Sequence, residues 1–143
     1  MSVERIDIGD EIPPLEVVLS GDDVRRYAIA ANMPGQRFHS DEVARKEGLP
    51  GQILPGNMSM ALLSRMLNEW LPQARLEKLG VTFRGIVRPA APIVCSGFVT
   101  DRRPHGEWVE IDCDLILEQA GERRITGVAV LRLDPPAATA PRG

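Results

Sequence analysis

The sequence contains few of the residues that mark several protein classes. Among 143 residues there are two cysteines and two histidines, and 4% are aromatic. Two cysteines cannot form a disulfide scaffold, and metal sites need closer clusters of ligands. No apolar run approaches the roughly 18 residues that span a membrane, and the acidic start MSVERIDIGDEI does not resemble a secretory signal. We therefore expect a cytoplasmic protein with reduced thiols, no cofactor, no metal and no membrane partner.

Basic residues are also too few for a polyanion-binding protein. The net charge is -3 and the pI is near 5.4, so there is no excess of cations to neutralise phosphates. We therefore expect no nucleic-acid partner. With 43% apolar residues, the chain is long enough for one domain with a real core. We assign this domain to residues 1–133 and predict that the Pro/Ala-rich residues 134–143 are disordered.

Three helices are expected in the first half of the chain. Ser20 and Asp23 form an S-x-x-D capping pattern before a helix that stops ahead of Pro34-Gly35. A short helix is expected over residues 40–46, with Ser40 as its N-cap and Gly48 at its C-terminal end. The third helix, over residues 56–71, is apolar around most of its circumference, which predicts burial on most sides. Its apolar residues are Met58, Ala61, Leu62, Leu63, Met66, Leu67, Trp70 and Leu71.

The remaining segments indicate strands. Two short runs, residues 5–8 and 15–19, are separated by Pro13-Pro14, which disfavour a continuous central strand. Alternating or apolar segments after residue 74 predict four more strands, with Gly121 in the last turn. These segments are residues 75–87, 94–101, 109–118 and 125–133. Strands in succession predict an antiparallel sheet, and one apolar helix predicts that the sheet wraps it. We therefore expect an α+β fold of the hot-dog type, whose sheet edges favour an oligomer.

Residues 27–63 resemble the hydratase motif of MaoC-like dehydratases and R-specific enoyl-CoA hydratases. The matching positions are His39-Ser40-Asp41 for the H-x-D element and Ala44 with Gly48 for the following A…G. The segment Ile53 to Met58 matches the one that opens the central helix of the family. The resemblance implies water addition to, or removal from, an enoyl (3-hydroxyacyl) thioester carried on CoA or an acyl carrier protein.

The resemblance also implies site residues. His39 corresponds to the general acid/base, and Gly56, with Pro55 and Asn57 beside it, corresponds to the oxyanion site that polarises the thioester. Unpaired N–H groups at a helix N-terminus favour developing negative charge. The alternatives are that His39 is a capping or surface histidine, and that Pro55-Gly56 is a tight turn into the helix.

The chain departs from the family at its acids. Pro34 stands where the family has its catalytic Asp, Gln36 where it has Asn, and Pro55 where it has a second histidine. In the related β-hydroxyacyl carrier-protein dehydratases the acid lies on the central helix, at the place of Ala61. We therefore expect the partner of His39 to be Asn32, Gln36 or a residue of another subunit.

Other residues carry weaker signals. His105 is interpreted as an exposed turn histidine, and Cys95 and Cys113 as small buried residues in neighbouring strands. Met58, Met60 and Met66 are interpreted as core residues. Four arginines could bind the phosphates of CoA or of a phosphopantetheine arm, or could simply be solvated strand ends. These are Arg84, Arg88, Arg102 and Arg103.

Three hypotheses for function follow. The first is an active hydratase or dehydratase that uses His39, with a thioester as substrate, in a homodimer or a heteromer with a related chain. The second is a non-catalytic hot-dog subunit of a heteromeric hydratase, which the vacant acid positions favour. The third is a hot-dog thioesterase or a small-molecule binding protein.

Overall fold

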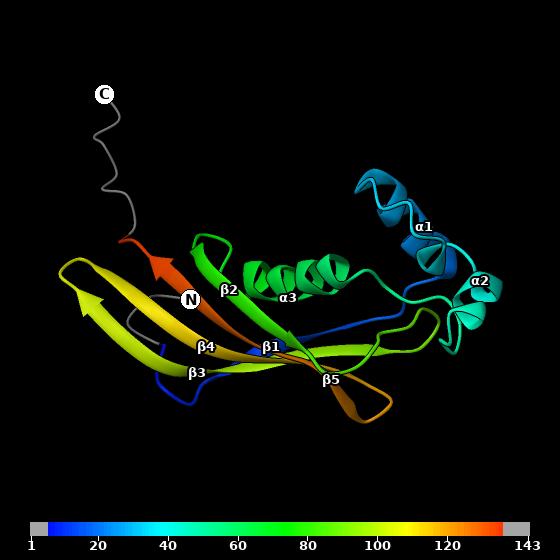
Figure 1. Ribbon diagram of the computed structural model, residues 1–143. Coiled ribbons are helices and arrows are strands. Elements are labelled where there is room, and N and C mark those ends of the chain that lie inside the picture. The colour runs from blue at the N-terminus through cyan, green and yellow to red at the C-terminus, as the bar shows by residue number, and fades with distance from the viewer. Residues whose placement is uncertain (1–5, 136–143) are drawn as a thin grey trace.

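The computed structural model describes residues 6–135. Five strands form one antiparallel sheet in the order β1-β3-β4-β5-β2, which curves around helix α3 (Figure 1). Helices α1 and α2 stand beyond one end of the sheet (Figure 1). The elements are β1 (Glu11–Val17), α1 (Gly21–Ala30), the 3₁₀ turn η2 (Gln36–Phe38), α2 (Asp41–Lys46), α3 (Gly56–Trp70), β2 (Arg75–Phe83), β3 (Ile93–His105), β4 (Trp108–Gln119) and β5 (Glu122–Leu133).

The expected wrapping of a sheet around one helix is confirmed. Helix α3 buries Leu62, Leu63, Met66, Leu67 and Trp70 against the inner face of the sheet. This face presents alternate residues of each strand, and in β4 these are Val109, Ile111, Cys113, Leu115, Leu117 and Gln119. Burial of this apolar surface, at roughly 25 cal/mol per Å², provides most of the stability of the fold.

One side of α3 is nevertheless open. Ala61, predicted to widen the buried stripe, is exposed, as are Asn57 and Asn68. Glu69 lies on the same open side and pairs with Arg65 at 2.9 Å. The helical period places these polar residues together, so α3 contacts the sheet with a broad face rather than all round.

The prediction of two separate N-terminal strands was wrong. Ile6 and Ile8 belong to no strand, and β1 runs through Pro13 and Pro14. The ladder of β1 with β3 shifts between Ile12 and Leu15, so a bulge accommodates both prolines. Because β1 is an edge strand, a residue without an N–H removes no central ladder bond there.

The helix caps and the last turn form at the residues that the sequence predicted. Ser20 accepts from the Asp23 N–H while the Asp23 carboxylate accepts from the Ser20 N–H, which completes a capping box. Ser40 caps α2, and Gly48 follows this helix with φ of 89°. Ala120 and Gly121 both have positive φ in the β4–β5 turn.

The predicted bounds of the domain and of the tail extend beyond the residues that the structure describes. The disordered tail assigned to residues 134–143 lies outside the described residues apart from 134 and 135, and residues 1–5 of the assigned domain also lie outside. Within residues 6–135, no helix combines the length and hydropathy needed to cross a bilayer.

Candidate functional site

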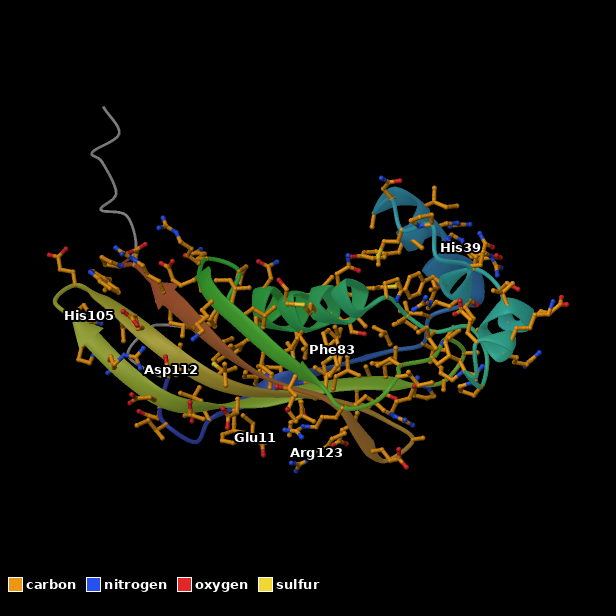
Figure 2. The ribbon with its side chains drawn as sticks, in the orientation of Figure 1. Glu11, His39, Phe83, His105, Asp112 and Arg123 are labelled. Atoms are coloured by element: carbon orange, nitrogen blue, oxygen red, sulfur yellow. The ribbon has the colours of Figure 1, made fainter. Side chains whose placement is uncertain are left out.

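His39 lies on the segment that carries α1 and α2, beyond the N-terminal end of α3 (Figure 2). Its backbone N–H donates to Gln36 O at 2.9 Å, and its carbonyl accepts from Arg25 Nη1 at 3.3 Å. The imidazole is half-buried, and its Nε2 lies 3.1 Å from Met33 O.

That contact determines the tautomer of His39. A carbonyl oxygen only accepts hydrogen bonds, so Nε2 must carry the proton that it donates to Met33 O. In the neutral ring, Nδ1 is then the acceptor. The ring is thus held by one hydrogen bond, with a basic nitrogen on its other side, as general base catalysis requires.

The amides expected beside His39 have other roles in the part of the chain described here. Asn32 follows α1 with φ of 55°, and the N–H groups of Asn32 and Met33 donate to Ile29 O and Ala28 O. This is a Schellman cap, where asparagine tolerates left-handed geometry. Gln36 Nε2 donates to Pro34 O at 3.5 Å. Neither amide makes a hydrogen bond with the His39 ring among the described contacts.

Gln52 holds the segment around His39 in place, and sequence reasoning missed it. This side chain is 3% exposed, and its Nε2 donates to Phe38 O at 2.8 Å and to Gly21 O at 3.0 Å. Its backbone N–H donates to Asp41 Oδ1 at 2.7 Å. Gln52 therefore joins α1, η2 and α2. The only signal in the sequence was an amide within the apolar stretch Gly51 to Pro55.

Asp41, the aspartate of the H-x-D element, is engaged by this packing. Its carboxylate accepts from the Gln52 N–H and lies 3.9 Å from Arg88 Nη2. A β-carbon at Gly51 would lie 2.8 Å from the same Oδ1, so this turn has no room for a side chain. Asp41 thus supports the turn before α3 as well as the start of α2.

The N-terminus of α3 presents the expected oxyanion donors. Pro55 is the N-cap, and Pro55 O accepts from the N–H groups of Met58 and Ser59. The N–H groups of Gly56 and Asn57 have no acceptor among the described residues, as expected of a first helical turn. Pro55 itself is buried and Asn57 exposed.

Phe83 is a second residue of this site that the sequence did not indicate. It ends β2 on the inner face of the sheet and is 54% exposed. A β-carbon at Gly56 would lie 2.8 Å from Phe83 Cζ, so the ring rests on the first residue of α3. The sequence predicted a strand over residues 75–87, which contains Phe83, but it assigned no role to the side chain of Phe83.

His39 and Gly56 lie at the same end of the molecule. The Ile53 N–H donates to Arg37 O at 3.2 Å, two residues before His39 and three before Gly56. At about 3.5 Å per residue, this bond brings both positions within roughly 10 Å of one crossing point. The Leu54 N–H donates to Val87 O at 2.8 Å and fixes the same segment to the β2–β3 connection.

The other residues singled out in the sequence are paired with neighbouring side chains or buried in the sheet. His105 is exposed, stacks on Trp108 and lies 3.1 Å from a Glu110 oxygen. Arg103 donates to both Glu110 and Asp112 at 2.7 Å, and this pairing lowers the pKa of Asp112. Burial raises the pKa of both thiols, Cys95 and Cys113, to about 12, which disfavours the nucleophilic thiolate form.

Among the other basic residues, Arg84 Nε donates to Thr126 Oγ1 at 3.0 Å on the outer face of the sheet. Arg88 Nε is buried without a partner among the described residues. No group of His, Cys, Asp and Glu within residues 6–135 has the arrangement of a metal site.

Solved structures share this architecture throughout the chain. A MaoC-like dehydratase from Rhodospirillum rubrum superposes with a TM-score of 0.84 at 16% identity, covering 96% of this chain and 99% of its own. This chain has the hot-dog fold. The (R)-hydratase from A. caviae involved in PHA biosynthesis gives a TM-score of 0.79 at 18% identity, covering 94% of this chain and 100% of its own.

A third structure with this fold is a chain of the ChsH1-ChsH2 complex from Mycobacterium tuberculosis. Its TM-score is 0.80 at 16% identity, and the match covers 89% of this chain and 98% of that one. No family model and no curated protein sequence matches this hot-dog chain. At these identities the likeness establishes the fold, and the function has to be argued from the site.

Proposed function

We propose that the chain is a hydratase or dehydratase of enoyl (3-hydroxyacyl) thioesters, carried on CoA or an acyl carrier protein. The observation that carries the proposal is the His39 ring, whose Nε2 is held by Met33 O so that Nδ1 is the basic nitrogen. The free N–H groups of Gly56 and Asn57 add a site for the thioester oxygen.

The reaction follows from these two elements. In hydration, Nδ1 of His39 removes a proton from water while the water oxygen bonds to C3 of the enoyl group. Electrons move through C2 to the thioester oxygen, which the N–H groups of Gly56 and Asn57 stabilise. The enolate then collapses, and C2 takes the proton from Nδ1. Dehydration is the reverse, and one histidine serves both proton transfers.

Measurement of crotonyl-CoA hydration by the wild type and by His39→Ala tests this proposal. A positioned acid/base contributes roughly 10²- to 10⁴-fold, so we expect a loss of turnover of this size with an unchanged far-UV circular dichroism spectrum. His105→Ala is the matched control, because His105 lies at the opposite end of the sheet (Figure 2). This control should retain full turnover.

The pH profile tests the single-base mechanism separately. Because no ion pair joins the His39 ring to a carboxylate within residues 6–135, we expect the pH profile of turnover to show one ionisation and not two. A bell with a second limb at low pH would contradict the mechanism, and Asp41 would then be the first carboxylate to replace.

A second candidate is a non-catalytic subunit of a heteromeric hydratase. It is favoured by Pro34 and by the exposed Ala61, which leave the expected acid positions without a carboxylate. Equal and negligible rates for the wild type and His39→Ala would support this candidate. Activity should then appear on co-expression with a MaoC-like chain that has an intact Asp/His motif.

A hot-dog thioesterase would instead release free CoA, which a thiol reagent detects in the same assay.

We propose that the working particle is a dimer or larger, alone or with a related hot-dog chain. In the described chain, the outer edge of β2 pairs with no strand, which leaves a row of backbone groups available. A stable monomer of 15.7 kDa that binds no related chain would contradict this.

A further inference from the structure

The convex face of the sheet, opposite α3, is uncovered in the described chain (Figure 1). Strand residues alternate between the two faces, so Asp112, Asp114, Ile116 and Glu118 of β4 point outward. Glu11 and Arg123 also extend from this face (Figure 2). The face carries apolar residues at its centre: Phe98 is 41% exposed and Val128 is 46% exposed.

A hollow of about 690 Å³ lies in this face, over β2, β5 and β4, and Phe98 on β3 lines its far side. The hollow arises at Gly80, which has no side chain and lies between Lys78 and Thr82 on the outer face of β2. A β-carbon at Gly80 would meet only Val128 Cγ2, at an ordinary 3.7 Å, and Gly80 does not have positive φ. Nothing within the described chain requires glycine there. Since glycine weakens a strand, its presence points to close approach of a group from outside.

The register places an exposed aromatic ring at a defined distance from this hollow. Phe98, Asp114, Val128 and Gly80 form one continuous cross-strand row. Phe98 on β3 is thus three strand spacings, roughly 14 Å, from Gly80 on β2. Phe98 and Gly80 thus stand at opposite sides of the hollow, on either side of the β4–β5 boundary, so two copies of the same face can fit together ring to glycine.

The charged side chains of the convex face also differ between its β1 side and its β2 side. Glu118 on β4 and Arg123 on β5 are cross-strand partners. Neither forms an ion pair within residues 6–135. Lys78 lies on the β2 side of the face, whereas Glu11 and Glu16 lie on β1. Glu11, Glu16 and Glu118 therefore lie toward the β1 edge, and Lys78 and Arg123 toward the β2 edge. Arg103 on β3 is already paired with Glu110 and Asp112.

We propose that two copies of this chain pack their convex faces together about a two-fold axis. The axis runs parallel to the strands, between β4 and β5. It exchanges β3 with β2 and β4 with β5, so Phe98 of each copy enters the hollow over Gly80 of the other. Glu118 of each copy then faces Arg123 of the other. Stacked sheets lie about 10 Å apart with strands roughly aligned, which suits this arrangement.

The charges select this axis over the alternative. A two-fold axis perpendicular to the strands would place each strand against its own copy. Glu11 and Glu16 of one β1 would then face the same acids on the other, which is unfavourable. The contact proposed here is isologous and closed, and it does not depend on the proposed enzymatic function.

Gly80→Val tests the hollow. Valine suits an exposed strand position, and its β-carbon has room, so the fold should be retained and checked by far-UV circular dichroism. Its side chain fills the space that Phe98 of the second copy would occupy. In sedimentation velocity at about 10 µM, we expect a wild-type particle of two chains, or of four if β2 edges also pair. Gly80→Val should halve that mass.

Phe98→Ser should have the same effect as Gly80→Val. Ile29→Ser is its matched control, because Ile29 is 71% exposed on α1, far from this face, and its replacement should leave the mass unchanged. A wild type that is monomeric, or an unchanged mass in both Gly80→Val and Phe98→Ser, overturns the proposal.

Charge reversal distinguishes a second copy from a different protein. Glu118→Arg alone and Arg123→Glu alone should each weaken the association, since each places like charges opposite one another. The double variant restores opposite charges across the two-fold axis and should recover at least half of the wild-type particle. If the double variant associates no better than the single variants, the face does not bind its own copy.

Discussion

The ring of Phe83 rests directly on Gly56, so that a β-carbon at position 56 would lie 2.8 Å from Phe83 Cζ. The end of β2 and the start of α3 are therefore in direct contact in the candidate site. Glycine at the first position of α3 leaves the room that this ring occupies.

A double-mutant cycle measures this contact. We expect Gly56→Ala to lower the free energy of unfolding by about 1 kcal/mol, because Phe83 must rotate out of place. In the Phe83→Ala background the same change should be neutral or stabilising, because alanine favours a helix by up to about 1 kcal/mol over glycine. Urea unfolding of the four proteins gives the coupling. Equal effects of Gly56→Ala in both backgrounds would show that the ring does not lie there.

Gln52→Leu should be among the most destabilising single changes near the site. Leucine matches the volume of glutamine but leaves Phe38 O and Gly21 O without their donor in a buried place. Each unpaired buried group destabilises by about 1–3 kcal/mol. Urea unfolding should show a loss of this size, whereas the exposed Gln73→Leu should change stability by less than about 0.5 kcal/mol. A Gln52→Leu protein as stable as wild type would contradict the role assigned to this amide.

Asp112 should contribute to stability in a pH-dependent way. Its hydrogen bonds with Arg103 lower its pKa in the folded state below the ordinary value. The contribution is therefore complete above the unfolded pKa of about 3.9 and is lost as the pH falls through the lower folded value. Urea unfolding between pH 7 and pH 2.5 should show this loss in the wild type and a shallower acid limb in Asp112→Asn. Glu107→Gln, in the exposed β3–β4 turn, is the control and should follow the wild type.

Neither thiol should react while the protein is folded. Burial raises the pKa of Cys95 and Cys113 to about 12, so the thiolate is scarce at pH 8, and both side chains are covered. We expect no modification by a disulfide reagent in native buffer and two equivalents in denaturant. Rapid native labelling of either cysteine would mean that the sheet opens near it.

Regular patterns in the sequence predicted the parts of the fold that local chemistry determines. The capping box at Ser20, the start of α3 at Gly56 and the buried cysteines all depend on neighbours in the chain or on simple periodicity. The path of β1 through Pro13 and Pro14 was missed, because strand position at the edge of a sheet is a tertiary property. The exposure of Ala61 was missed for the same reason, since a small apolar residue is compatible with either face of a helix.

The candidate site was only partly predictable. His39 and Gly56 were identified through a motif, and their shared end of the molecule follows the expected topology. Gln52 and Phe83 carry no local signal, because their importance comes from Phe38, Gly21 and Gly56, which lie far from them in the sequence. The Met33 carbonyl that orients His39 is a backbone group, and side-chain patterns contain no information about it.

The bulge at Pro13 and Pro14 makes the two borders of the sheet unequal. A further strand can add along β2, but β1 offers two residues without an N–H and a broken ladder. A molecule whose sheet can pair only along β2 can join one further sheet, because the β1 edge of each molecule cannot add another strand. Repeated strand addition, the route to a fibril, is thereby interrupted after a single step, so this chain is built for assemblies of finite size.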